Sequence, residues 1–406
     1  MAYRVRTVRD LGEFRAAVGV IGHYFGWVPS EEDGERFSKL LPLERVHAVL
    51  DGREIVAGAG AFPFELTVPG GPLRCAGVTV VGVLPSHRRR GLLTRMARAQ
   101  LADVRARGEP IAALWASEET IYGRHGYGMA SLCQVDMRLP RAHAALRDGR
   151  PPAGAVRLVS SDEALAEFPR LYERVRRRTV GFTSRSRDWW ELRNLADRPE
   201  QRRGGGPLNR VLLEEGGRPA GYALYRVASQ FEGAINKGSV RVIEAIAVSP
   251  AATRELWSFL MSIDWLSELR TDLLPLDHPL LHLAARPNHM VWKVADGIWL
   301  RLVDVGAALA ARSYAADGRV TLEVVADPIF AENVGTWTIE DGVARRTRRR
   351  PDVRLDVQTL GSAYLGGFTF AQLARAERVE EASRGGLARA DALFRTDVAP
   401  WCPENF

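Results

Sequence analysis

The sequence predicts an α+β protein in which two related units are followed by a different third module. Three observations support this fold class. The apolar, β-branched segment Val78–Val83 leads through a basic turn into an amphipathic helix, and a similar strand–turn–helix pattern recurs at 242–269. After Ile298 the arrangement of predicted strands and helices changes. A chain of 406 residues is also long enough for two or three domains.

The first unit opens with a short strand and a helix and continues with a hairpin. Tyr3–Thr7 alternates between apolar and polar residues, and Leu11–Val20 is amphipathic. Val46–Leu50 and Ile55–Glu65 are strand-like and flank Asp51-Gly52, which is typical of a tight hairpin turn. A second turn, rich in glycine and proline, then leads into the predicted strand Val78–Val83.

Two more strands complete the first unit in this interpretation. Ile111–Ser117 is a short apolar run that reads as a buried strand. Met129–Leu139 alternates in the manner of a strand with one buried face. We expect both segments in the sheet of the first domain, and a helix over Arg141–Arg147 after it.

The turn after Val78–Val83 carries the features of an anion-binding site. Pro85 ends the strand, three arginines follow at 88–90, and apolar residues recur at helical spacing from Leu92 onward. The first N–H groups of a helix lack intrahelical acceptors, and the helix dipole favours negative charge there. Arg88 and Arg89 would add charge-assisted hydrogen bonds to a phosphate, and Gly91 would let the backbone approach closely. A solvated basic helix start is the alternative, and the strand–turn–helix context favours the anion site.

An aromatic segment, His23–Trp27, precedes an acidic one, Glu31–Glu35, near the N-terminus. One interpretation is helix packing beside a solvated acidic face. The other is the wall of a pocket for a cationic amine, because aromatic faces and carboxylates together attract cations. The sequence leaves both interpretations open.

Composition excludes several classes of protein. Apolar residues make up 46% and charged residues 26% of the chain, as in ordinary globular proteins. The apolar runs are shorter than the roughly 20 residues that a membrane span needs, and the N-terminus has no signal-peptide pattern. The three cysteines, Cys75, Cys133 and Cys402, form no metal-binding pattern and are typical of reduced thiols. We expect a cytoplasmic protein without a membrane-bound segment or a metal site.

The formal net charge is +7, and one dense basic cluster stands at Arg345–Arg350. Such a cluster can bind nucleic acid or another anionic surface. It contains no interleaved aromatic residues and lies between two strand-like segments. A solvated loop or an ion-paired patch between subunits therefore remains the favoured interpretation, and no nucleic-acid partner is expected.

The second unit follows a predicted linker at Asp148–Pro152. When Pro250 is set over Pro85, Thr253 stands opposite Arg88 and Leu256 opposite Gly91. The glycine is lost, and a carboxylate replaces one arginine of the basic turn. Such a turn would repel and crowd a phosphate, so we expect the second unit not to bind one.

The third module alternates short strands and helices after Ile298 and ends in an apolar tail. Val320–Val325, Gly335–Ile339 and Val353–Val357 read as strands. The tail Pro400–Phe406 holds two prolines, a Trp and a Phe, so we expect it to dock on the protein.

Two segments of the first unit together resemble the GNAT acyltransferases. The family signature is a strand, then Q/R-x-x-G-x-G/A, then a helix, and later a strand ending in a Y-x-x-x-G-F/Y turn. Here the first motif is Arg88-x-x-Gly91-x-Leu93, with Leu93 at the usual Gly or Ala position. The second motif is the segment Tyr122–Tyr127.

The whole chain resembles the Eis (enhanced intracellular survival) acetyltransferases, a GNAT subfamily. Besides the two motifs and the degenerate second unit, the resemblance rests on Trp299–Val305, Ser362–Gly367, Leu387–Phe394 and Trp401-Cys402-Pro403 with Phe406. It implies a GNAT domain at 1–145, a second GNAT-like domain without cofactor at 146–292, and a sterol-carrier-protein-like domain at 293–406. It also implies a homohexamer.

The resemblance implies direct, acetyl-CoA-dependent N-acetylation of a small-molecule amine, an aminoglycoside or similar polyamine, in a ternary complex. Protein lysines are an alternative acceptor, and a non-enzymatic lipid carrier is an alternative of a different class. By position in the family motifs, Tyr122 matches the general acid and the terminal carboxylate, here on Phe406, matches the base. Tyr127 is interpreted as structural. The implied acetyl-CoA contacts are Val81, Val83, Arg88, Arg89, Gly91, Leu92, Leu93 and Ser117.

Overall fold

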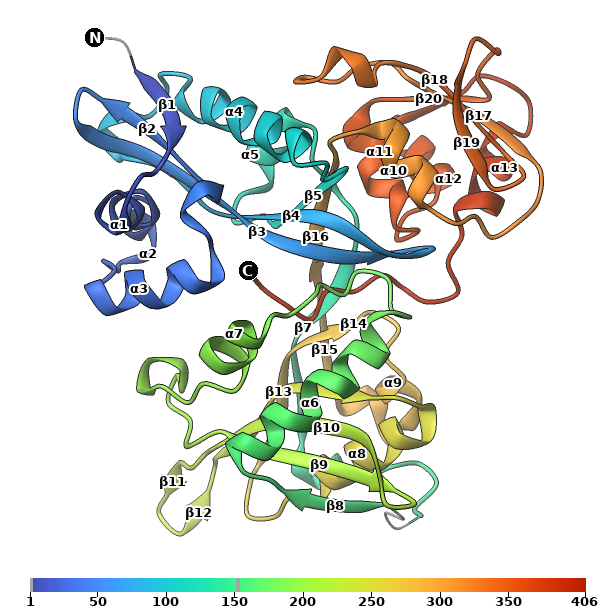
Figure 1. The fold of residues 1–406 in the computed structure, drawn as a ribbon. Coiled ribbons are helices and arrows are strands. Elements are labelled where there is room, and N and C mark those ends of the chain that lie inside the picture. The colour runs from blue at the N-terminus through green and yellow to red at the C-terminus, as the bar shows by residue number, and fades with distance from the viewer. Residues whose placement is uncertain (1–2, 151–153) are drawn as a thin grey trace. The chain divides into compact units, whose positions relative to one another are not determined.

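The computed structural model describes residues 3–150 and 154–406, which divide into two compact units. The first unit comprises the chain up to Ser131 together with Gly297–Pro400 and Glu404–Phe406. The second unit comprises Leu132–Asp296 and Trp401–Pro403. The predicted linker at Asp148–Pro152 lies partly outside the described residues. Figure 1 labels the elements of both units.

A mixed sheet forms the centre of the first unit, in the order β1-β2-β3-β4-β5-β16-β6. Only the β4–β5 pair in it is parallel, and the remaining pairs are antiparallel. The strands are β1 (Arg4–Thr7), β2 (Val46–Asp51), β3 (Glu54–Val68), β4 (Gly71–Val83), β5 (Ile111–Trp115), β16 (Ile298–Leu302) and β6 (Gly128–Met129).

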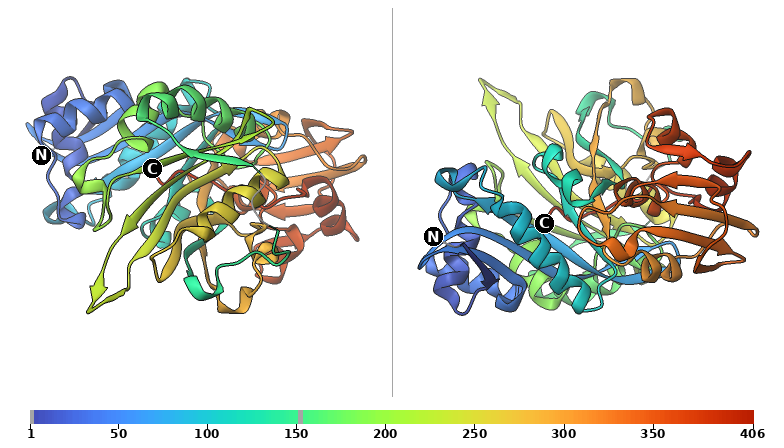
Figure 2. Two further views of the ribbon diagram at one scale, coloured as in Figure 1. Left: turned by 90° about the horizontal axis from the view of Figure 1, so that it is seen from below. Right: turned by 90° about the horizontal axis from the view of Figure 1, so that it is seen from above.

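Helices cover both faces of this sheet, as Figures 1 and 2 show. The helix α4 (Leu92–Ala106) buries Leu92 and Met96 against Ala57 and Ala59 of β3. The opposite face of β3 carries Gly58, where an added Cβ would lie 2.1 Å from the carbonyl oxygen of Ala17. Glycine is therefore needed there because α1 (Leu11–Gly19) lies directly on the strand.

The strands β4 and β5 part soon after they meet. They pair in parallel only from Cys75–Gly77 to Ile111–Ala113. Beyond this point the register between β4 and β3 shifts, and Val80 adopts a φ of 48°. A β-branched residue in this left-handed region marks a β-bulge, which bends the strand and increases its twist. The remainder of β4 up to Val83 therefore has an open edge on the side of β5.

The second unit repeats this design with a mixed sheet in the order β15-β7-β14-β13-β10-β9-β8. β13 and β14 pair in parallel only from Ser239–Val242 to Glu268–Thr271, and a bulge separates the contacts of Leu224 and Tyr225 with β13. The sequence-based repeat is thus confirmed. The strands are β7 (Leu132–Pro140), β8 (Ala155–Leu158), β9 (Asn209–Glu215), β10 (Arg218–Ala228), β13 (Ser239–Ala247), β14 (Glu268–Pro275) and β15 (Val291–Asp296).

Two helices pack on the sheet of the second unit. They are α6 (Ser161–Arg176) and α8 (Pro250–Ser262). A short hairpin of β11 (Phe231–Glu232) and β12 (Ile235–Asn236) projects away from the sheet, as both views of Figure 2 show.

Two strands lie outside the domains to which the sequence assigned them. β7, expected in the first domain, pairs with β14 and β15 of the second unit. β16, expected in the third domain, lies between β5 and β6 of the first sheet. For these strands the linear boundaries 1–145, 146–292 and 293–406 are corrected. Alternation predicts that a segment is a strand, but it does not specify the neighbours of that strand.

The last sheet has the order β19-β18-β17-β20-β21 and belongs to the first unit. Its strands are β17 (Arg319–Val324), β18 (Gly335–Glu340), β19 (Val343–Thr347), β20 (Val353–Leu355) and β21 (Val379–Glu381). Its helices are α10 (Val305–Ala311), α11 (Val357–Tyr364), α12 (Phe370–Arg375) and α13 (Gly386–Phe394).

Two local predictions are wrong. The predicted helix over Arg141–Arg147 is only a 3-10 turn, Arg141–His143. The predicted strand Val353–Val357 ends at Leu355, because the Asp356 carboxylate accepts a hydrogen bond from the Thr359 N–H (2.7 Å) and caps α11.

The basic cluster Arg345–Arg350 begins within the edge strand β19. Arg346 donates hydrogen bonds to the carbonyl oxygens of Glu332 (3.1 Å) and Val334 (2.7 Å). Arg345 and Arg349 both pair with Glu340, at 2.8 and 3.2 Å. These contacts favour an ion-paired surface.

We expect Leu300→Ala to lower the free energy of unfolding of the first unit by about 2–5 kcal/mol, because removal of a buried Leu leaves a cavity. Leu300 is fully buried in β16 between β5 and β6. Urea unfolding measures the effect, and Val294→Ala is the control, because Val294 is 48% exposed on the edge strand β15. Equally small effects of both substitutions would contradict a central place for β16.

Candidate active site

A cavity of about 490 Å³ opens in the first unit between the end of β4, the start of α4 and the turn after β5. The sequence had singled out nine residues for cofactor binding and acid catalysis besides Phe406, and all nine line this cavity. They are Val81, Val83, Arg88, Arg89, Gly91, Leu92, Leu93, Ser117 and Tyr122. The structure therefore brings together segments that are up to about 40 residues apart in the chain.

One end of the cavity is the basic loop before α4. Arg89 has a φ of 61° and Gly91 a φ of 72°, so the chain turns sharply before the helix begins at Leu92. Gly91 is the N-cap and has no side chain to cap the helix, and the first intrahelical bond runs from the Arg95 N–H to the Gly91 carbonyl oxygen (3.1 Å). The N–H groups of the first turn, from Leu92 to Thr94, are thus left for an external acceptor. A Cβ at Gly91 would meet no atom within 4 Å, so space for a ligand exists there.

The three arginines of this loop have different roles. Arg90 donates hydrogen bonds to the hydroxyl of Tyr3 (2.6 Å) and to the carbonyl oxygen of Ser86 (3.1 Å). Arg88 and Arg89 are exposed, and across residues 3–150 and 154–406 neither makes an ion pair or side-chain hydrogen bond. Arg90 therefore holds the loop, and the other two guanidinium groups can bind an anion.

The open edge of β4 forms one wall of the cavity. Val81 and Val83 are two residues apart, so their backbone groups face the same edge of the strand. The Tyr24 hydroxyl, on α2 (Gly22–Phe25), already donates a hydrogen bond to the Val83 carbonyl oxygen (2.6 Å). Sequence reasoning did not assign this role to Tyr24, although the aromatic run His23–Trp27 drew attention to the segment.

Tyr122, the last residue of α5 (Glu119–Tyr122), lines the same cavity. Its side chain is 9% exposed. Burial raises the pKa of the Tyr122 phenol above its ordinary value, and a hydrogen bond with the Ser117 side chain offsets part of this rise. The phenol is therefore protonated at neutral pH and can donate a proton. The Tyr127 ring lies edge-on at 6.3 Å and is buried, in line with its predicted structural role.

Three glycines fix the turn that carries Tyr122, because other elements of the unit lie directly on it. A Cβ at Gly123 would lie 2.7 Å from the Gln358 side chain, and one at Gly128 would lie 2.0 Å from the Gln358 carbonyl oxygen. Gly126 has a φ of 82°, and a Cβ there would lie 2.5 Å from the Arg301 guanidinium. Arg301 in turn forms an ion pair with Asp327 (2.6 Å) in which neither side chain is exposed. The turn is thus held by α11 and β16, far along the chain.

Phe406 lies outside the lining of this cavity. Its ring packs edge-on against Phe64 at 5.1 Å and Phe62 at 6.4 Å. A Cβ at Gly77 would lie 3.3 Å from the Phe406 ring, so Phe406 lies where β4 and β5 begin to part. The Trp115 indole N–H, at the end of β5, donates to the Glu404 carbonyl oxygen (2.6 Å).

The predicted docking of the tail is confirmed, and Trp401 provides a second anchor. Within the second unit, the Trp401 N–H donates to the Val180 carbonyl oxygen (2.9 Å), and its ring packs on Phe182 at 5.2 Å. Gly181 has a φ of 98°, and a Cβ there would lie 2.6 Å from the Trp401 carbonyl oxygen. The backbone of the tail therefore lies directly on this glycine.

The acidic segment Glu31–Glu35 mainly starts a helix. Ser30 and Asp33 form a capping box at the start of α3 (Glu31–Leu40), and Asp33 also pairs with Arg36 at 2.9 Å. Glu31 pairs with Arg15 at 3.2 Å. These contacts favour the structural interpretation of the acidic residues.

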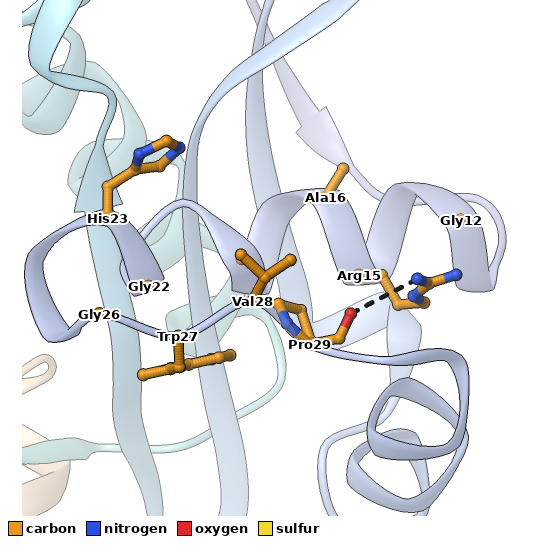
Figure 3. A pocket seen from close by; sticks show the side chains of 10 residues that line it. Gly12, Arg15, Ala16, Gly22, His23, Gly26, Trp27, Val28 and Pro29 are labelled. Carbon is orange, nitrogen blue, oxygen red and sulfur yellow. Dashed lines mark hydrogen bonds between the residues drawn. The ribbon is translucent and has the colours of Figure 1, made fainter.

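A separate, open pocket of about 610 Å³ lies beside these helices (Figure 3). It is bordered by α1, α2 and the segment Gly26–Pro29. Arg15 donates to the Pro29 carbonyl oxygen (3.4 Å) across it, and the Trp27 side chain is 40% exposed. The residues that line this pocket include no acidic side chain, and Arg15 pairs with Glu31, so the pocket lacks the excess negative charge that the second interpretation required.

The second unit lacks a counterpart of the basic loop. Only Val248 and Ser249 connect β13 to α8, and Thr253 and Leu256 lie inside the helix. The sequence alignment set these two residues opposite Arg88 and Gly91, which precede their helix, so that alignment is wrong at these positions. The Ser249 hydroxyl accepts from the Ala252 N–H (3.0 Å), and Pro250 has no N–H, so this helix start satisfies most of its own donors.

Two absences hold for the part of the chain that the structure describes. No group of three or more His, Cys, Asp or Glu side chains is placed to hold a metal ion. No helix there is long and apolar enough to cross a membrane.

Comparison with protein families gives three matches along the chain. Two profiles described as acetyltransferase (GNAT) domains match residues 4–130 and 181–302, and a sterol carrier protein domain matches residues 305–403. These matches bear out the predicted fold class.

Relatives of this chain include N-acetyltransferases of actinobacteria. An uncharacterized N-acetyltransferase of Streptomyces avermitilis is 38% identical over 393 residues, which cover 95% of each chain. The N-acetyltransferase Eis of Mycobacterium tuberculosis is 36% identical over 382 residues, or 90% of each chain. Among solved structures, Eis1 of Mycobacterium abscessus superposes with a TM-score of 0.87 at 34% identity, covering 99% of this chain and 100% of that one.

We expect Gly77→Ala to loosen the end of the chain, because the new Cβ would lie 2.4 Å from the Phe64 ring and 3.3 Å from the Phe406 ring. Carboxypeptidase should then release Phe406 faster than from the unmodified protein. Gly12→Ala on the exposed face of α1 is the control, since its Cβ would meet only an Asp10 carboxylate oxygen at 3.2 Å. Equal rates of release would show that Phe406 is not held by this packing.

Proposed function

The chain belongs to the Eis family of GNAT N-acetyltransferases, and we propose that it acetylates amines of aminoglycosides or similar polyamines by direct transfer from acetyl-CoA in a ternary complex. One observation carries the proposal. A single cavity is lined by an uncapped helix start, by two arginines that make no ion pair within the described residues, and by a buried, protonated phenol. This combination suits an anionic cofactor that also carries a reactive group.

The basic loop fits the pyrophosphate of acetyl-CoA, which supplies the acetyl group as a thioester. Arg88 and Arg89 provide charge-assisted hydrogen bonds, and the N–H groups at Leu92 and Leu93 provide neutral ones. Gly91 leaves room for the phosphates to approach the backbone. The open edge of β4 at Val81 and Val83 lies along the path from this loop to Tyr122.

We assign Tyr122 the role of general acid, which protonates the departing thiolate. The raised pKa of its phenol keeps the proton in place at neutral pH, when the reaction needs it. Ser117, as the hydrogen-bond partner of this phenol, orients it. Tyr127 closes the wall behind Tyr122 and takes no part in proton transfer.

The α-carboxylate of Phe406 is the group that we propose as the base, following its match to the family. Its support in this structure is the anchoring of the tail by Trp115, Phe62 and Phe64 near the point where β4 and β5 part. A carboxylate with an ordinary pKa near ~3.5 is a weak base. Its role is therefore to orient the amine, directly or through water, and to accept the proton as the new N–C bond forms.

We further propose that each protomer of a homohexamer binds one acetyl-CoA, in the first unit. The two-residue connection before α8 and its self-capped start leave no loop for a second pyrophosphate. A titration with CoA should give one site per protomer, and mass measurement in solution tests the hexamer.

A thiol-release assay with acetyl-CoA tests the acceptor class. The panel comprises aminoglycosides, linear polyamines and lysine peptides, and mass spectrometry locates the acetyl groups. Fastest turnover with aminoglycosides or polyamines supports the proposal. Turnover with lysine peptides alone would identify a protein-lysine acetyltransferase, and lipid binding without any acetyl transfer would identify a lipid carrier.

Arg88→Ala should raise the KM for acetyl-CoA by roughly tenfold, the value of one charge-assisted hydrogen bond to a phosphate. Steady-state kinetics measure this change. Thr253→Ala is the control, because Thr253 lies inside α8 and its hydroxyl only bonds the Ser249 carbonyl oxygen (3.0 Å). An unchanged KM in Arg88→Ala would remove this arginine from the cofactor site.

Tyr122→Phe should lower kcat by about 10²-fold with little change in the KM for acetyl-CoA, because it keeps the ring and removes the acidic proton. Since burial raises the pKa of the phenol, the wild-type kcat should show no loss from Tyr122 ionisation up to about pH 9. Near-wild-type kcat in the variant would reduce Tyr122 to a packing residue.

Residues appended after Phe406 should abolish most acetyl transfer and leave CoA binding intact, because they convert the α-carboxylate into an amide. Deletion of Phe406 should act similarly, since it moves the carboxylate by up to ~3.5 Å. The same tag at the N-terminus is the matched control. Full activity of the C-terminally extended protein would exclude the Phe406 carboxylate from the mechanism.

A further inference from the structure

One polar side chain in the cavity has no role so far. His125 ends the 3-10 turn Gly123–His125 that follows Tyr122, and its side chain is 5% exposed. It lines the same cavity as Val81, Leu93 and Tyr122. Within the described residues no side-chain hydrogen bond or ion pair involves His125. A buried imidazole without a protein partner costs free energy, unless a ligand or water satisfies it.

The surroundings keep this imidazole neutral. Burial lowers the pKa of His125 below its ordinary value, and the guanidinium groups of Arg124, Arg301 and Arg98 lower it further. The other titratable groups that line the cavity are Tyr24, His87, Arg88, Arg89, Glu118, Tyr122 and Arg124, of which the Tyr122 phenol stays protonated and Glu118 is exposed. A neutral imidazole presents one N–H donor and one nitrogen acceptor. It therefore matches an uncharged group with both functions better than it matches a phosphate.

The place of His125 in the cavity indicates which part of a ligand reaches it. The phosphate-binding features all belong to the loop Arg88–Gly91 and the first turn of α4. Val81, Leu93 and Ile121 share the cavity with His125, and Arg124 lines it as well. His125 also borders a separate small cavity that is lined mainly by apolar side chains such as Val78 and Met96, together with Gln100. These surroundings favour a ligand segment that is an uncharged chain with isolated polar groups.

We propose that His125 binds an amide of the pantetheine arm of acetyl-CoA and so sets how far the thioester extends toward Tyr122. An amide offers a carbonyl acceptor and an N–H donor, which pair with the donor and the acceptor of a neutral imidazole. The open edge of β4 lines the same cavity. This inference rests on the proposed use of acetyl-CoA.

Two variants separate hydrogen bonding from packing. His125→Phe keeps a ring of similar size and loses both polar functions, and His125→Gln keeps a donor and an acceptor. Calorimetric titration compares two probes, CoA and adenosine 3′-phosphate 5′-diphosphate. The probes share the nucleoside and all three phosphates, and only CoA carries the pantetheine arm.

His125→Phe should bind CoA roughly threefold to tenfold more weakly, the range for one neutral hydrogen bond, and should bind the nucleotide probe as tightly as the wild type does. His125→Gln should recover most of the lost affinity. In acetyl transfer, His125→Phe should raise the KM for acetyl-CoA more than it lowers kcat. Arg88→Ala is the complementary control, because Arg88 is proposed to bind the phosphates that both probes share, so this substitution should weaken the binding of both probes equally.

Unchanged CoA affinity in His125→Phe would overturn the inference and leave the proposed function standing. Equal weakening of both probes would also overturn it, because it would indicate a distorted cavity. A thermal unfolding midpoint equal to that of the wild type checks that the variant is folded. Failure of the wild-type protein to bind CoA at all would overturn the inference together with the proposed function.

Discussion

The candidate site depends on the parting of β4 from β5 after Gly77. Parallel strands normally bond along their whole shared length, and here the pairing stops after Cys75–Gly77. The bulge at Val80, with its left-handed backbone, turns the rest of β4 away and leaves its edge open. That edge, the following basic loop and the turn after β5 together line one cavity. If the two strands stayed paired, the backbone N–H and C=O groups of Val81 and Val83 would form hydrogen bonds within the sheet.

A second constraint is the support of the Tyr122 turn by residues far along the chain. Gly123 and Gly128 contact Gln358 of α11, and Gly126 contacts Arg301 of β16, at distances that admit no Cβ. The fully buried Arg301–Asp327 pair fixes that guanidinium. A buried pair of this kind is costly to break on one side. Gln358 and Asp327 belong to the part of the chain that matches a sterol carrier protein domain, so this part supports the turn that carries Tyr122.

The two GNAT units share a scaffold but differ at the start of the helix that follows the matching strand. Both have a hairpin strand that pairs briefly in parallel with the next strand, and both place a helix between them. In the first unit the helix start has a glycine cap with free donors and unpaired arginines beside it. In the second, Ser249 and Pro250 satisfy or remove those donors. The difference lies in a connection of a few residues, while the sheets remain alike.

The sequence by itself determined the family, the fold class, the repeat of the first unit in the second and the docking of the tail, because local patterning and motif spacing encode them. It also identified the nine residues that meet in the cavity. It could not determine that β7 pairs with β14 of the second unit or that β16 pairs with β5 of the first, since alternation carries no information on pairing partners. Only the tertiary structure distinguished the role of Arg90 from the roles of Arg88 and Arg89, because it showed that Arg90 donates hydrogen bonds to Tyr3 and Ser86. Only the tertiary structure showed that His125 is buried in the cavity and has no hydrogen-bond partner among residues 3–150 and 154–406, because burial and hydrogen bonding arise from long-range packing.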